Sequence, residues 1–180
     1  ELSDICGCDF SLPSKRETQN AVRMFFGEKP LIEAHFGETS INAAGERFCG
    51  DSSERFIDQS GRANMILSDG MGSGDYAALD SMMTAGLTAK LVKAGFRFGA
   101  AIKLVNSALL LKSENESLAT VDAFSMNLYT GRADFYKSGA APSFIMKNGK
   151  ASKIESVSMS IGILGRAEYE QNSVILGTGD

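Results

Sequence analysis

The fold of this chain is decided around one stretch, Met65-Ile66-Leu67-Ser68-Asp69-Gly70-Met71-Gly72-Ser73-Gly74. A short apolar run ends in the carboxylate of Asp69, a glycine-rich turn follows, and a helical pattern starts at Tyr76. A carboxylate at a strand end, beside backbone without side-chain bulk, suits a hard metal ion that prefers oxygen ligands. A phosphate-binding loop is the main alternative, but no Lys-Ser or Lys-Thr pair follows the glycines, and Asp69 and Asp75 would repel an anion. The stretch therefore predicts a metal site.

Strands are predicted on the N-terminal side of this stretch. Residues 63–67 are mostly apolar and fit a buried central strand. Residues 31–42 mix polar and apolar residues as a strand does, with residues 22–26 as a hairpin partner. Residues 47–57 form a further candidate strand, and residues 1–30 are polar and irregular, which predicts a linker or N-terminal extension.

Two consecutive helices are predicted after the glycine turn. Asp75 is a suitable N-cap for the first helix, and Gly95 is a natural stop after it. The second helix is predicted over residues 98–112. The apolar faces at helical spacing are Leu79, Met83, Leu87 and Leu91 in the first helix, and Phe98, Ile102, Val105 and Leu109 in the second.

Strands return after the helices. Residues 121–128 and 133–137 are separated by a Thr-Gly turn, and residues 143–147 and 153–157 by Asn148-Gly149, a strong hairpin signal. Strands, two helices and then hairpin-linked strands predict an α+β domain, with a mainly antiparallel sheet and the helix pair on one face.

Composition limits the function. The 180 residues, 43% of them hydrophobic, suffice for the core of one domain, and the net charge of −4 argues against nucleic-acid binding. No apolar run reaches the roughly 18 residues that span a bilayer, so no membrane contact by this chain is expected. An odd count of three cysteines favours a reduced, cytoplasmic setting over a disulfide framework. The start at Glu1 indicates a segment of a longer protein.

Two acidic sites stand out, Gly50-Asp51-Ser52 and Ser68-Asp69-Gly70. If their strands are neighbours, both carboxylates approach one metal centre. Asp and Gly also begin and end turns routinely, and for Asp51 alone the turn interpretation is favoured. His35, the single histidine, is better explained as a strand residue than as a catalytic base. Asp122 shares a strand face with apolar residues, which favours a hydrogen-bonded pairing over support of a nearby site.

The combination of motifs resembles a known family. They are Gly50-Asp51-Ser52, Leu67-Ser68-Asp69-Gly70-Met71-Gly72, Ile102-Lys103-Leu104-Val105-Asn106-Ser107-Ala108-Leu109, Ser117-Leu118-Ala119-Thr120-Val121-Asp122, Lys137-Ser138-Gly139-Ala140-Ala141-Pro142-Ser143-Phe144 and Ile161-Gly162-Ile163. The chain resembles the type 2C-like, metal-dependent serine/threonine protein phosphatases, and within them the stage II sporulation protein E family. The resemblance runs from about residue 31 onward. It implies an extension over residues 1–30 and the N-terminal portion of a phosphatase domain over residues 31–180.

The resemblance also implies a site and a reaction. The fold would be a layered β-sandwich of mainly antiparallel sheets flanked by helices, with two Mn²⁺ or Mg²⁺ ions at one end. Asp69 would bridge both ions and be the catalytic residue, Gly70 would offer its backbone carbonyl, and Asp51 would act on one ion directly or through water. A metal-bridging hydroxide would hydrolyse a phosphoserine or phosphothreonine protein, of the anti-sigma-factor antagonist type in sporulation control. The parent protein in that family is anchored in the membrane by an upstream segment.

Two departures from the family pattern matter. Ser160 stands where close relatives carry proline, and the sequence ends at Gly179-Asp180, ahead of a second Ser-Asp-Gly and a paired-Asp motif that supply metal ligands in the family. We therefore expect the 180 residues alone to lack the C-terminal strands, to bind metal weakly and to be nearly inactive. Open sheet edges or the helix pair would allow homo-oligomers. The alternative function is a phosphatase-like regulatory or binding module without activity. A third hypothesis joins the two, with a partner on the helix pair controlling metal binding.

Overall fold

The computed structural model describes residues 1–180 except residues 12–13, 43, 46, 73 and 113–116. The elements in chain order are α1 (Leu2–Cys6), β1 (Ser14–Thr18), β2 (Ala21–Phe25), β3 (Asp51–Ile57), β4 (Arg62–Asp69), α2 (Gly74–Lys93), α3 (Phe98–Lys112), β5 (Val121–Asn127), β6 (Arg132–Ser138), β7 (Ser143–Lys147), β8 (Lys150–Ile154) and β9 (Glu170–Ile175). No helix among the described residues is both long and apolar enough to cross a lipid bilayer.

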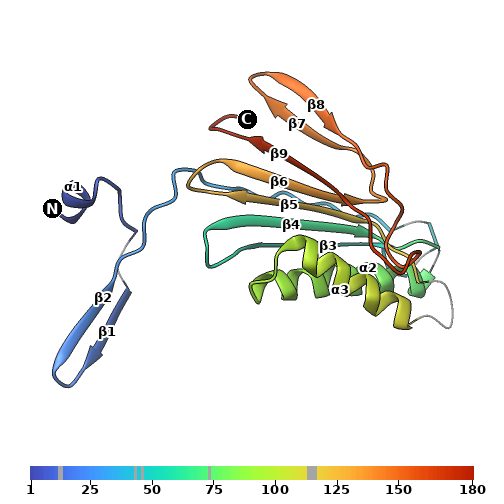
Figure 1. The fold of residues 1–180 in the computed structure, drawn as a ribbon, viewed down its shortest axis with the longest axis horizontal. Helices are drawn as coiled ribbons and strands as arrows, with labels where there is room; N and C mark the ends of the chain where they lie inside the picture. The colour runs from blue at the N-terminus through green and yellow to red at the C-terminus, as the bar shows by residue number, and fades with distance from the viewer. Residues whose placement is uncertain (12–13, 43, 46, 73, 113–116) are drawn as a thin grey trace.

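A five-stranded antiparallel sheet, in the order β3-β4-β5-β6-β9, forms the centre of the molecule. Helices α2 and α3 lie along one side of this sheet, while α1 and the β1–β2 hairpin stand apart at the N-terminal end (Figure 1). The main core lies between sheet and helices, where Ile66 of β4 meets Ile102 and Leu109 of α3, all with no exposed surface. The predicted α+β class with antiparallel sheets flanked by helices is confirmed.

Strand β4 is the buried central strand that its apolar run predicts. It pairs with β3 on one side and with β5 on the other. Ala63 and Ile66 have no exposed surface although they lie on opposite faces of the strand, and Ile66 packs in the core beneath the helices. The prediction for residues 47–57 was too long at its start, since β3 begins at Asp51.

Helix α3 has the predicted bounds and the predicted buried face. Helix α2 differs in two ways. It begins at Gly74, so Asp75 lies in the first turn, near the positive end of the helix, and is not the N-cap. Its buried face is built from small and polar residues, and the predicted leucine face was wrong in part, because Leu79 is 44% exposed. The buried residues include Ala77, Ala78, Ser81, Thr84, Ala85, Thr88 and Ala89.

The small residues of α2 have a physical consequence. They let the helix axis come close to the sheet and to α3, and larger residues such as Leu87 and Leu91 then cover the edge of the core. Helix α2 ends at Lys93, and Gly95, whose φ is +93°, is the predicted stop just after it. The Gly95 amide donates to the Val92 carbonyl at 2.9 Å and the Phe96 amide donates to the Leu91 carbonyl at 3.0 Å, which is a Schellman motif.

The predicted pairing of residues 31–42 with residues 22–26 was wrong. Strand β2 pairs with β1 instead, because a two-residue connection closes that hairpin locally. Within residues 31–36, exposed and half-buried residues alternate as they do in a strand, yet the described backbone forms no strand there. The alternation arises because this segment lies over the sheet, where the Ile32 amide donates to the Leu128 carbonyl at 3.0 Å. The division of the chain at residue 30 stays a prediction.

The second hairpin is confirmed at its turn. Asn148 and Gly149 have φ values of +50° and +72°, as a two-residue turn with two left-handed positions requires. Strand β8 begins at Lys150, three residues before the predicted start, because a two-residue turn lets pairing resume at once.

Candidate metal centre

The two predicted acidic ligands lie directly opposite each other. Asp51 is the first residue of β3, Asp69 is the last residue of β4, and the antiparallel register pairs one with the other. The Gly70 amide donates to the Gly50 carbonyl at 3.1 Å, so the pairing continues past the strand ends. Residues that face each other in an antiparallel pair project from the same side of the sheet. The structure therefore brings both carboxylates together, and their role as metal ligands stays a prediction.

The electrostatics of the acidic pair suit a cation. Burial, the largest influence, raises the pKa of the Asp69 carboxyl, and the charge of Asp51 and a side-chain hydrogen bond between the two carboxyls raise it further. Two close carboxylates repel each other and compete for a shared proton. A divalent cation between them would remove that repulsion, so the residues present fit a hard metal ion.

Gly70 is required by the approach of α2. A Cβ atom at this position would lie 1.8 Å from the Ala77 carbonyl oxygen, which is backbone and cannot move aside alone. The carbonyl oxygen of Gly70 lies 3.9 Å from the position of a Cβ on Gly50, immediately before Asp51 in the chain. Backbone without side chains thus lies beside the acidic pair at Gly50 and Gly70, and the role of the Gly70 carbonyl as a metal ligand stays a prediction.

Cys49 and Thr120 also adjoin the pair, and sequence reasoning missed both. The Cys49 thiol lies 3.9 Å from Oδ2 of Asp51, and the Asp69 amide donates to Oγ1 of Thr120 at 2.9 Å. Cys49 stands two residues before Asp51, which is a signal in the sequence, whereas Thr120 is distant in the chain. Among the residues that the structure describes, no cluster of three or more His, Cys, Asp or Glu side chains could hold a metal ion. Mg²⁺ takes about six oxygen ligands, so Asp51, Asp69 and Gly70 would supply only part of its coordination sphere.

Asp122 has the hydrogen-bonded pairing that its place on an apolar strand face favours. Its Oδ2 lies 2.6 Å from Nζ of Lys137 and accepts a hydrogen bond from Oγ of Ser143 at 2.8 Å. Lys137 also donates to Oγ of Ser143 at 2.7 Å and has no exposed surface. The three side chains join β5, β6 and β7 beside Leu67, which faces Asp122 across the β4–β5 pair.

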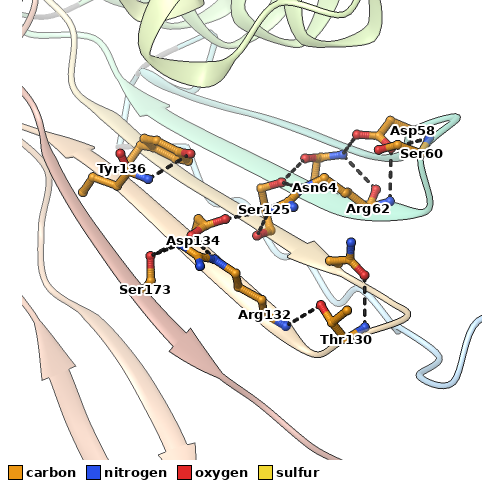
Figure 2. Close-up of polar contacts among 12 residues, drawn as sticks. Asp58, Ser60, Arg62, Asn64, Ser125, Thr130, Arg132, Asp134, Tyr136 and Ser173 are labelled. Atoms are coloured by element: carbon orange, nitrogen blue, oxygen red, sulfur yellow. Dashed lines mark hydrogen bonds and ion pairs between the residues drawn. The ribbon is translucent and has the colours of Figure 1, made fainter.

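A second polar network lies at the other end of β4, around the turn from Asp58 to Arg62 (Figure 2). The Asp58 carboxylate accepts hydrogen bonds from the Ser60 and Arg62 amides, and Gly61 has a φ of +74°. The Arg62 guanidinium lies 2.8 Å from the Asp134 carboxylate, and the side-chain amide of Asn64 donates to the Asp58 carboxylate at 3.1 Å. These polar groups satisfy one another, so the network fixes the β3–β4 turn.

A family model for stage II sporulation protein E (SpoIIE) matches residues 59–180, more than half of the chain and including Asp69. The chain belongs to the SpoIIE family. Curated relatives agree with this assignment. The stage II sporulation protein E of Priestia megaterium is 32% identical over 172 residues, which is 94% of this chain and 29% of that protein. The Bacillus subtilis (strain 168) protein is 30% identical over 155 residues, which is 86% of this chain and 19% of that protein. This SpoIIE-family chain thus spans less than a third of either relative.

Solved structures agree with the fold. The PP2C phosphatase domain of SpoIIE from Bacillus subtilis, with a fragment of its regulatory domain, matches with a TM-score of 0.71 and 28% identity, covering 99% of this chain and 54% of that one. RsbX in complex with magnesium matches with a TM-score of 0.66 and 18% identity, covering 93% of this chain and 74% of that one, which is a likeness of fold alone. This SpoIIE-family chain therefore has the fold of PP2C-type phosphatases.

Proposed function

We propose that this chain carries part of the active site of a metal-dependent phosphatase that hydrolyses phosphoserine or phosphothreonine in a protein. The observation that carries the proposal is the register of β3 and β4, which pairs Asp51 with Asp69 at one end of the sheet. Membership of the SpoIIE family and the PP2C-type fold support the same reaction class.

In this proposal the oxygen ligands come from three residues. Asp69 and Asp51 supply carboxylate oxygens from adjacent strands, and Gly70 supplies its carbonyl. A bound pair of Mn²⁺ or Mg²⁺ ions would supply Lewis-acid stabilisation of the phosphoryl oxygens and activation of water. The hydrogen-bonded strand ends hold the main chain of both aspartates in place before any cation arrives, which lowers the cost of ordering the site on binding.

The proposed substrate is a phosphorylated anti-sigma-factor antagonist in sporulation control, acting in the cytoplasm. The family assignment supports this choice, because the curated relatives are sporulation proteins. Self-association through sheet edges or the helix pair stays a prediction. Control of metal binding by a partner on the helix pair also stays a prediction.

A second candidate function is a phosphatase-like regulatory or binding module without activity. One observation favours it: within the described residues, no third acidic, histidine or cysteine side chain completes a metal-binding cluster with Asp51 and Asp69.

Manganese-dependent hydrolysis separates the two functions. The complete gene product that contains this sequence, called the full-length chain below, and residues 1–180 alone are assayed side by side with a small phosphate ester and a phosphoserine peptide. Asp69→Asn and Asp51→Asn are the test variants, and Asp9→Asn, at an exposed position remote from the site, is the matched control. We expect activity in the full-length chain that falls at least about 100-fold with Asp69→Asn and stays unchanged with Asp9→Asn, consistent with the loss of a metal ligand. Absence of Mn²⁺-dependent hydrolysis in every form at saturating metal would leave the second function.

A further inference from the structure

The hydrogen bonding between β4 and β5 departs from the regular antiparallel pattern at Asp69. Regular pairing ends at Leu67 and Asp122, and the next hydrogen-bonded position is Asp69 opposite Thr120. In a regular antiparallel pair, each residue would donate its amide to the carbonyl of the other. The Thr120 amide does donate to the Asp69 carbonyl, at 2.8 Å. The Asp69 amide, however, donates to the Thr120 side chain, at Oγ1 and 2.9 Å.

The Thr120 carbonyl has a different partner. It accepts a hydrogen bond from Oγ of Ser68 at 2.8 Å, and Ser68 has no exposed surface. The Thr120 side-chain hydroxyl therefore takes the place of the Thr120 carbonyl as the acceptor for the Asp69 amide. The main chain of Asp69 is fixed on both of its polar groups by one residue, at the point where β4 leaves the ladder.

We propose that Thr120 is a positioning residue, which holds the backbone of Asp69 so that its carboxylate faces Asp51. This inference rests on the proposed function, because the orientation matters for metal binding. Without the hydroxyl, the Asp69 amide would lose its acceptor, and an unpaired amide favours rotation of the peptide toward water or back to the Thr120 carbonyl. Either change would redirect the side chain that follows from that peptide. Groups that orient metal ligands in this way affect metal affinity about 10- to 100-fold.

The sharpest test compares two substitutions at one position in the full-length chain. Thr120→Val keeps the shape of the side chain and removes the hydroxyl, while Thr120→Ser keeps the hydroxyl. Thr88→Val is the matched control, since Thr88 is fully buried in α2 and its hydroxyl has no hydrogen-bond partner within the described residues. Asp69→Asn reports on the proposed function itself.

Three readouts are needed. Mn²⁺ affinity is measured by isothermal titration calorimetry, exchange of the Asp69 amide proton by NMR in metal-free protein, and thermal unfolding with and without Mn²⁺. We expect Thr120→Val to weaken Mn²⁺ binding about 10-fold or more and to speed Asp69 amide exchange at least about 10-fold, with Thr120→Ser within about threefold of wild type. Thr88→Val should match wild type in Mn²⁺ affinity and in Asp69 amide exchange.

The outcomes distinguish the two proposals. If Thr120→Val lowers the melting temperature but leaves Mn²⁺ affinity and Asp69 amide exchange at wild-type values, Thr120 has a structural role alone and the inference is wrong. If Asp69→Asn itself leaves Mn²⁺ affinity unchanged, the proposed function fails, whatever Thr120 does. Should Thr120→Val not fold, Ser68→Ala provides the test, because it frees the Thr120 carbonyl to compete with the Thr120 hydroxyl for the Asp69 amide. A changed rate of Asp69 amide exchange is then expected, and an unchanged rate would contradict the inference.

Discussion

Replacing the buried Lys137 tests how much its ion pair with Asp122, on an apolar face of the sheet, contributes to the stability of the fold. Lys137→Met keeps the length of the side chain and removes the ammonium group. The Lys137 side chain has no exposed surface, and the Asp122 side chain is 21% exposed. The substitution would leave the Asp122 carboxylate with the Ser143 hydroxyl as its described side-chain partner, in surroundings that include Leu67 and Phe124.

The magnitude follows from this geometry. Removal of one partner from a buried ion pair costs about 3–5 kcal/mol, since an unpaired charge stays behind. Partial exposure of Asp122 and its bond to Ser143 place the cost at about 3 kcal/mol, the lower end of that range. A domain of this size loses about 2–4 °C in melting temperature per kcal/mol, which gives about 6–12 °C. The double variant Lys137→Met/Asp122→Leu should regain at least half of the loss, because no charge remains unpaired.

Urea unfolding followed by circular dichroism measures these free energies. Lys153→Met is the matched control, because its ion pair with Glu155 has both side chains about half exposed, and it should change stability by less than about 0.5 kcal/mol. The reasoning is refuted if Lys137→Met costs less than about 1 kcal/mol, or if the double variant is no more stable than the single one.

Two further predictions concern Gly70 and Asp134. Gly70→Ala should lower the melting temperature by several degrees and abolish Mn²⁺-dependent hydrolysis in the full-length chain, because the added Cβ meets the Ala77 carbonyl oxygen at 1.8 Å. Its control, Gly86→Ala, meets no atom within 4 Å inside α2 and should stabilise by about 0.5–1 kcal/mol in thermal unfolding; a wild-type melting temperature for Gly70→Ala would contradict the clash. Burial raises the pKa of Asp134, but its hydrogen bonds and the charge of Arg132 outweigh this and lower the pKa below 3.8. The hydrogen bonds come from Ser173, Arg62 and Arg132. A lowered pKa in the folded state means that the carboxylate stabilises the fold above the pKa of the unfolded state, and that this stability is lost as the pH falls through the folded pKa. Melting temperature against pH should therefore fall less steeply below about pH 4 for Asp134→Asn than for wild type, and equal slopes would contradict this.

Sequence reasoning succeeded where one kind of side chain dominated a pattern. Helix α3 has large apolar residues at helical spacing, and its predicted bounds match the structure. It failed for the buried face of α2, because alanine, serine and threonine are small enough to pack closely and carry little apolar signal. The strand prediction for residues 31–42 failed because a strand needs a partner, and pairing depends on segments far away in the chain.

The candidate site divides in the same way. Asp69 was singled out by residue type and by the glycines beside it, which are local signals, whereas for Asp51 the same signals favoured a turn and its ligand role came from the family resemblance. Thr120 was missed because its contact with Asp69 spans 51 residues of chain and depends on the register of β4 and β5. A threonine at the start of a strand is not a distinctive signal in a sequence. The proposed positioning role of Thr120 therefore follows from its hydrogen bond to Asp69 alone.

The turn from Asp58 to Arg62 has a consequence for how this sequence can vary. Asp51 and Asp69 face each other because the residues between them are divided evenly about that turn. Insertion of one residue within β3 or β4, with the turn unchanged, would slip the register by one position and send one of the two carboxylates to the opposite face of the sheet. Insertion of two residues would lengthen both strands and keep the pair. Among natural variants that keep this site and this turn, the separation of the two aspartates should therefore change in steps of two, unless a β-bulge absorbs the odd residue.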